Sequence, residues 1–108
     1  MIDLDLYIND RLEIKLFGET IHLKEPTPRM YSKLNQIEKN LTRENIGEIR
    51  IQSALLFLNY NEEGKTFEKE QFEGIPFAVV DRITKEVVAM RERAEEDPNL
   101  RSQSRKGK

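Results

Sequence analysis

The sequence contains no cysteine, and no stretch of it approaches the ~20 consecutive apolar residues of a membrane-spanning helix. The lack of thiols excludes disulfides, thiolate metal sites and a cysteine nucleophile. The first residues are acidic, whereas a signal peptide begins with basic residues. We therefore expect a cytoplasmic protein that has no membrane partner.

Sequence motifs of common enzymes are also missing. There is no Walker loop, no dinucleotide glycine fingerprint, no His-Glu-x-x-His and no Gly-x-Ser-x-Gly. The five glycines occur singly, so the sequence offers no glycine-rich loop for phosphate. We expect a protein that is not an enzyme and that holds no cofactor or metal.

Basic residues gather at the end of the chain, although 18 basic and 20 acidic residues give a net charge of only −2. Residues 99–108 include no acid and four basic residues, Arg101, Arg105, Lys106 and Lys108. We predict one domain over residues 1–98 and a disordered basic tail over residues 99–108. The tail is either an electrostatic handle for nucleic acid or an ordinary terminus. The acidic remainder of the chain and the lack of aromatic residues in the tail favour the ordinary terminus.

Two segments near the N-terminus alternate apolar and polar residues, as half-buried strands do. Their apolar positions are Leu12, Ile14 and Leu16, then Ile21 and Leu23. A two-residue loop at Gly18-Glu19 would pair Leu16 with Ile21 and Ile14 with Leu23, which keeps one face apolar. Glycine at the first loop position suits a type II′ turn. We predict an antiparallel hairpin.

Residues 2–8 also alternate, with Ile2, Leu4, Leu6 and Ile8 at the apolar positions. We predict a further strand here. A three-residue loop over residues 9–11 would set Ile8 against Leu12 and Leu6 against Ile14. This loop contains no glycine, so the sheet is either the hairpin alone or a three-stranded meander.

Helical spacing dominates the rest of the sequence. Thr27 is a predicted N-cap with Pro28 as the first helical residue, and Thr42 is the predicted cap of a second helix. Thr66 is expected to cap a short charged turn that ends at Gly74, and Pro76 to open a last helix. The predicted class is α+β, with a small N-terminal antiparallel sheet followed by three to four helices.

Two polar features are candidate sites. His22 is the single histidine, and its position in the alternation places it on the polar face of the hairpin beside Lys15. Without a second ligand or an orienting carboxylate, we interpret it as a solvated strand residue. Asp3 and Asp5 share a strand face, but they lack the glycine and the final glutamate of a calcium loop. We interpret them as charges that discourage edge pairing.

An apolar stripe along the last helix is the candidate partner-binding surface. Its residues Ile83, Val87, Val88 and Met90 approach a charged, proline-terminated end with no later sequence to cover them. Helical stripes are usually core, but exposed apolar surface marks a partner site and methionine suits a flexible partner segment. We therefore predict that a partner segment docks on these residues.

The order of these features resembles a known family. The pattern Leu-x-Ile-x-Leu-Phe-Gly-x-x-Ile-x-Leu runs from Leu12 to Leu23, a Pro-Thr-Pro hinge follows, and a helix starts with Arg29-Met30-Tyr31. Further helices and a basic end complete the chain. This arrangement resembles the tail assembly chaperones of siphophages and prophages of Gram-positive bacteria.

The resemblance implies a function in the cytoplasm of the bacterial host. Such chaperones bind the long, helical tape measure protein and help to recruit the tail tube subunits, the major tail protein. A translational frameshift near the end of the gene adds a second domain in many members, and a homo-oligomer is also compatible with the resemblance. The alternative functions are a small structural or completion protein of the phage particle and a nucleic-acid-binding regulator that uses the basic tail.

Overall fold

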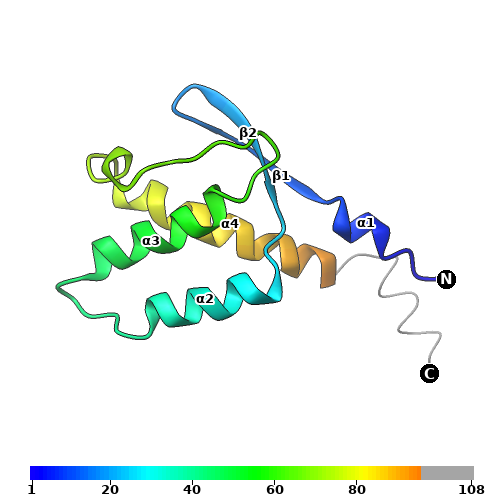
Figure 1. Ribbon diagram of the computed structural model, residues 1–108, viewed down its shortest axis with the longest axis horizontal. Helices are drawn as coiled ribbons and strands as arrows, with labels where there is room; N and C mark the ends of the chain where they lie inside the picture. Colours follow the sequence, from blue (N-terminus) through cyan, green and yellow to red (C-terminus); the bar gives the residue numbers. More distant parts are fainter. Residues whose placement is uncertain (96–108) are drawn as a thin grey trace.

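The computed structural model describes residues 1–95, and its architecture is α+β, as predicted (Figure 1). In chain order the elements are α1 (Asp5–Ile8), β1 (Arg11–Leu16), β2 (Glu19–Lys24), α2 (Pro28–Glu38), α3 (Ile46–Leu58), the 3-10 turn η1 (Lys69–Gln71) and α4 (Phe77–Glu95). Helix α3 packs against both α2 and α4, and the hairpin projects from one side of these helices. The predicted basic tail lies outside the described residues.

The hairpin forms with its apolar face intact, but its predicted loop and register are wrong. The loop is Phe17-Gly18, so Ile14 pairs with Ile21 and Leu12 with Leu23. Both loop residues have positive φ, 51° and 80°, as in a type I′ turn, which accepts glycine at its second position. A shift of two residues preserves the side-chain alternation, and so the predicted face survives the wrong register.

The positive φ of Phe17 is unfavourable for a bulky side chain and has a tertiary explanation. Its ring centroid lies 5.5 Å from that of Phe72 and 6.3 Å from that of Phe67. Such aromatic contacts contribute about 0.5–1.5 kcal/mol each, which is comparable to the backbone cost. The turn therefore depends on rings at least fifty residues away along the chain.

The strand predicted over residues 2–8 is wrong, and the sheet is a two-stranded hairpin. The Asp3 side chain accepts a hydrogen bond from the Asp5 backbone N–H at 3.1 Å, and the Asn9 side chain donates to the Asp5 carbonyl at 3.1 Å. These local bonds favour a helical turn over a strand. The result is the four-residue helix α1, which buries none of its residues.

The helix boundaries confirm some capping predictions and correct others. Thr27 caps α2 by accepting from the Met30 N–H at 3.3 Å, with Pro28 as the first helical residue, as predicted. Helix α3 starts at Ile46 instead of just after Thr42, because Thr42 and Asn45 bond each other's backbone N–H groups and form a separate turn.

The two predicted starts further along the chain also need small corrections. The charged turn η1 is capped by Glu68 and not by Thr66, through a reciprocal pair of bonds with Gln71. Helix α4 starts at Phe77, one residue after the predicted first residue Pro76, whose carbonyl accepts from the Val79 N–H at 3.0 Å.

The core lies where the hairpin, α3 and α4 meet. Ile21 and Leu23 of β2 are completely buried, whereas the β1 residues Leu12, Ile14 and Leu16 are only partly buried. The other buried apolar residues come from α2, α3, the two sides of η1 and α4. The two strands of one hairpin therefore differ in how well the helices cover them.

Candidate functional site

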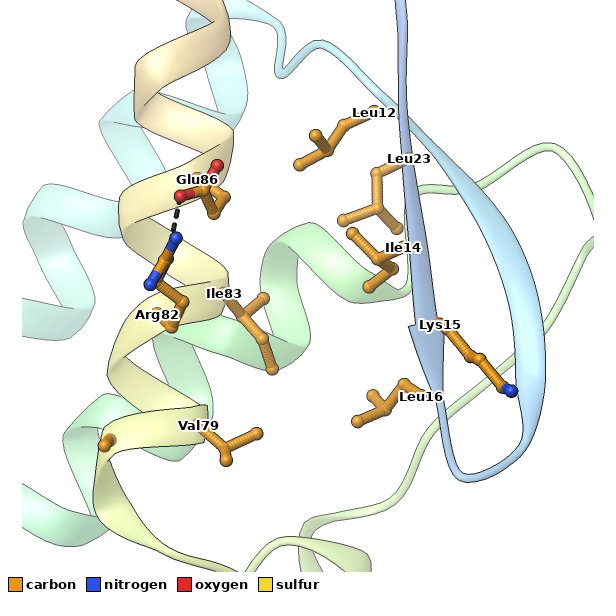
Figure 2. Close-up of a pocket in the computed structure, with 10 residues that line it drawn as sticks. Leu12, Ile14, Lys15, Leu16, Leu23, Val79, Arg82, Ile83 and Glu86 are labelled. Atoms are coloured by element: carbon orange, nitrogen blue, oxygen red, sulfur yellow. Dashed lines mark hydrogen bonds and ion pairs between the residues drawn. The ribbon is translucent and has the colours of Figure 1, made fainter.

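An apolar groove runs between β1 and α4 (Figure 2). We call it the β1–α4 groove. Leu12, Ile14 and Leu16 point into it from β1, and Val79 and Ile83 face them from α4. Its volume is about 380 Å³, within the range of small ligand sites and large enough for several apolar side chains.

The rim of the groove is charged. Arg82 Nε donates to Glu86 Oε2 at 2.7 Å along the exposed side of α4. Lys15 lies at the other rim, and its side chain points away from α4 (Figure 2). An apolar floor between charged rims favours an apolar segment that has polar groups on its outer side.

The outer edge of β1 borders the groove. Among the described residues, β1 pairs only with β2, so the backbone N–H and C=O groups on its outer side have no strand partner. An unpaired strand edge is a template for another strand. The groove and the edge together offer side-chain contacts and backbone hydrogen bonds to the same extended segment.

The residues predicted to bind a partner are mostly buried, so the expected exposed stripe on α4 is wrong. Val87 and Met90 are 0% exposed, and Ile83 is 8% exposed. Val88 is half-buried. The prediction assumed that no later sequence could cover them, but Val87 and Ile83 join the core shared with α3, which comes earlier in the chain. Of the four predicted partner-binding residues, only Ile83 lines the groove.

Sequence reasoning missed the groove for an identifiable reason. The strand predicted over residues 2–8 would have covered the outer edge of β1, so no open surface was expected there. The sequence signal that could have indicated the groove is the alternation of apolar and polar residues over residues 2–8, which lacks a glycine-containing loop to pair it with β1. The basic residues Arg101, Arg105, Lys106 and Lys108 lie outside the described residues.

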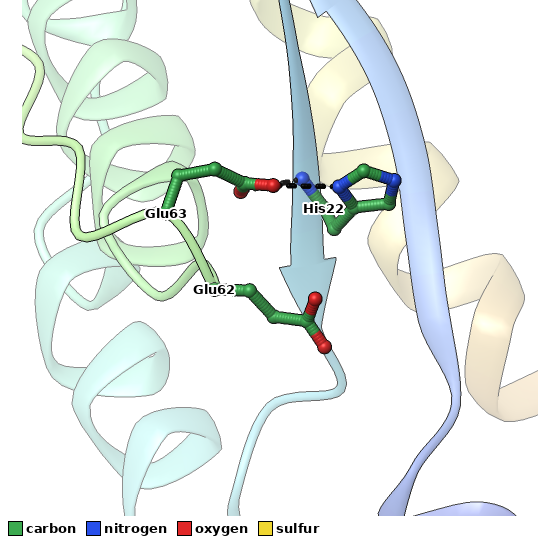
Figure 3. A group of neighbouring side chains, drawn as sticks. All are labelled: His22, Glu62 and Glu63. Carbon is green, nitrogen blue, oxygen red and sulfur yellow. Dashed lines mark hydrogen bonds and ion pairs between the residues drawn. The ribbon is translucent and has the colours of Figure 1, made fainter.

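His22 forms a charged cluster with two glutamates. Its ring pairs through Nδ1 with Glu63 Oε2 at 2.6 Å, and its backbone N–H donates to Glu63 Oε1 at 2.9 Å (Figure 3). The ring also pairs through Nε2 with Glu13 Oε2 at 3.1 Å. The hydrogen bond to Glu63, followed by that to Glu13, raises the pKa of His22. The bond to the His22 ring lowers the pKa of Glu63. The histidine lies on the polar face, as predicted, but it lies opposite Glu13 instead of Lys15. It therefore has the carboxylate partners that the sequence interpretation lacked.

This cluster also has the residue types of a metal site, since ligand atoms of His22, Glu62 and Glu63 lie within 4.8 Å of one another. Arg11 Nε pairs with Glu62, however, and places a positive charge beside the group. Both carboxylate oxygens of Glu63 are already hydrogen-bonded to His22. These pairings fit an ion-pair network that fastens the loop to the hairpin, and we assign no metal to it.

A half-buried carboxyl just after β2 is the other unusual titratable group. Burial, followed by the charge of Asp10, raises the pKa of Glu25, while Arg91 opposes the shift. Burial also raises the pKa of Tyr31, whose ring lies 5.8 Å from the Arg91 guanidinium. A half-buried carboxyl and a phenol do not by themselves define a reaction.

No protein-family model, curated protein or solved structure matches this chain. Within residues 1–95, none of the helices combines the length and apolar character required to cross a bilayer. The functional interpretation therefore relies on the groove, the open strand edge and the resemblance described above.

Proposed function

We propose that this chain is a non-enzymatic binding protein that accepts an apolar segment of another protein in the β1–α4 groove. Following the family resemblance, we propose that it is a phage tail assembly chaperone in the bacterial cytoplasm, that the segment belongs to the tape measure protein, and that the complex helps to recruit the major tail protein. The observation that supports this best is the apolar groove beside an unpaired strand edge.

The geometry supports segment binding in two ways. An extended stretch of a client that is otherwise helical would gain main-chain hydrogen bonds at β1 whatever its sequence, while alternate side chains enter the groove. A chaperone for a long and varied client needs this combination of tolerant backbone contacts and apolar contacts. Val79 is 38% exposed and Leu12, Ile14 and Leu16 are partly buried, so apolar surface is available for a client.

Val79→Asp tests the groove as the client-binding surface. Val79 is the third residue of α4, where a negative charge suits the helix N-terminus, so we expect the variant to fold. Burial of one such side chain contributes about 1.5–3 kcal/mol, so co-expression and pull-down with the tape measure protein should show at least about a tenfold loss of affinity.

Ile46→Asp is the matched control. Ile46 is 37% exposed and starts α3, and it does not line the groove. The control should bind at full strength. Equal binding by both variants would contradict the groove as the binding surface. Stoichiometric amounts of this chain in purified virions would instead favour the structural protein over the chaperone.

A further inference from the structure

Residues 2–8 expose apolar side chains that the fold leaves uncovered. Leu4, Leu6 and Ile8 are 62%, 58% and 70% exposed. A helix of four residues has little stability of its own, and apolar residues at every second position do not share one helix face. In a strand the same residues would form one continuous apolar face.

The β1–α4 groove has a complementary apolar lining. An antiparallel strand at the outer edge of β1 would point alternate side chains toward α4. Pairing Leu6 with Ile14 sets Leu4 opposite Leu16 and Ile8 opposite Leu12, which places three apolar residues at the groove.

The same register gives a favourable charge pair on the outer face. It sets Asp5 opposite Lys15, which is exposed and points away from α4 (Figure 2). An opposite-charge pair across neighbouring strands is stabilising, and a slip by one residue would turn the apolar side chains to solvent. Apolar pattern and charge therefore select one register.

The junction between the segment and β1 does not favour folding back within one chain. The Arg11 guanidinium donates to the Ile8 carbonyl at 3.0 Å and to the Asp10 carbonyl at 2.7 Å, and it pairs with Glu62. These contacts hold residues 8–11 so that α1 lies beyond the base of β1, away from the hairpin turn (Figure 1). Reversal of the chain there would need a tight loop without glycine.

Two copies reach the same register without any reversal. In this register the paired residue numbers always add up to 20, so residue 10 of one copy meets residue 10 of the other. Residues 2–8 of each copy then lie along β1 of the other, and the pairing is symmetric about a two-fold axis at Asp10, with Arg11 of each copy beside it. Both grooves and both open edges are filled at once.

We propose that this chain forms a two-fold symmetric dimer in which each copy inserts residues 2–8 as a strand between β1 and α4 of the other. This inference goes beyond the proposed function and does not depend on it. If the function is also correct, a client segment displaces the exchanged strand from the same groove.

Light scattering on the full chain over a range of concentrations tests the dimer. The wild type should be a dimer, and Leu4→Ser with Leu6→Ser should raise the dissociation constant at least about a hundredfold without loss of helical circular dichroism. The matched control is Leu41→Ser with Ile46→Ser, which removes two residues of 38% and 37% exposure outside the interface. A monomeric wild type, or a dimer that the Leu4 and Leu6 changes do not affect, would overturn the proposal.

Disulfide trapping separates exchange between copies from folding back within one chain. Because the chain has no cysteine, Asp5→Cys with Lys15→Cys introduces the only thiols, on the outer face of the proposed strand pair. Mild oxidation should give a covalent dimer. A disulfide closed within a monomer, or no disulfide at all, would overturn exchange with a second copy.

The proposed function fails separately from the dimer. The Leu4 and Leu6 variant should still bind the tape measure protein at full strength, whereas Val79→Asp should bind it at least about tenfold more weakly. Dimer formation by the Leu4 and Leu6 variant therefore tests the dimer alone, and client binding by Val79→Asp tests the proposed function.

Discussion

The two outer edges of the hairpin differ in how the rest of the chain covers them. The outer edge of β2 is covered by the loop after α3: the Lys24 N–H donates to the Tyr60 carbonyl at 3.0 Å, and the Glu62 N–H donates to the His22 carbonyl at 3.0 Å. The outer edge of β1 has no comparable cover among residues 1–95. Exposed edges invite pairing with other chains, and proteins usually block them. One blocked and one open edge therefore indicate where a segment from outside can add.

The blocked edge is secured by ion pairs as well as by backbone bonds. Arg11 pairs with Glu62, and His22 pairs with Glu63, so side chains from both strands hold the same loop. The open edge borders an apolar groove instead of a loop. The difference explains why β2 carries completely buried residues and β1 carries partly buried ones.

The largest expected effect compares a cross-strand pair. Leu23 on β2 is completely buried, and its partner Leu12 on β1 is partly buried. Leu23→Ala should lower the free energy of unfolding by about 2–5 kcal/mol, because it leaves a cavity in the core. Leu12→Ala should cost less than half as much, since its side chain already contacts solvent at the groove. Urea denaturation measures both, and equal losses would mean that the two strands are equally covered.

An intermediate effect is expected where the covering loop is anchored. Asn61 is buried, donates to the Leu58 carbonyl at 2.7 Å and the Lys65 carbonyl at 3.0 Å, and accepts from the Lys65 N–H at 2.9 Å. Asn61→Ala should cost about 1–3 kcal/mol, because it leaves buried backbone groups unsatisfied. Hydrogen exchange should accelerate at the Lys24 and Glu62 amides, which bind across this edge. Unchanged exchange there would show that the edge is held without this anchor.

The smallest effect is a pH dependence of the blocked edge. A histidine with a raised pKa stabilises the fold fully below its ordinary value of 6.5, and this contribution is lost as the pH rises through the folded-state pKa. The lowered pKa of Glu63 gives a contribution that is present above its ordinary value of 4.5 and is lost as the pH falls through the folded-state pKa. The pair should therefore contribute most between these two values.

Thermal melts of the wild type and His22→Gln check this pH dependence. The melting temperature of the wild type should fall relative to that of the variant as the pH rises above 6.5. Glu63→Gln should also remove most of this fall in melting temperature above pH 6.5, because Glu63 is the main cause of the raised pKa of His22. Parallel curves for the wild type and both variants would show that the cluster does not hold the edge.

Part of the site could be foreseen from the sequence. The alternation around Leu12, Ile14 and Leu16 placed these residues on one apolar face, and that face forms one wall of the groove. On the opposite wall, Ile83 was among the predicted partner-binding residues, but Val79 was not, because its place opposite β1 depends on how α4 packs. The carboxylate partners of His22 were also missed: Glu63 lies forty-one residues away, and Glu13 becomes its cross-strand neighbour only in the observed register.

The sequence by itself determined the class of the fold, the apolar face of the hairpin and the start of α2. These features depend on side-chain periodicity and on bonds within a few residues, such as that between Thr27 and Met30. Tertiary structure decided the turn at Phe17, the burial of Val87 and Met90, and the open edge of β1. Each of these depends on segments far apart in the chain: distant rings hold Phe17 at positive φ, and helix α3 packs along α4. Residues 2–8 show where prediction from sequence ends. Their apolar pattern favours a strand, but a strand forms only where the edge of a neighbouring strand is within reach.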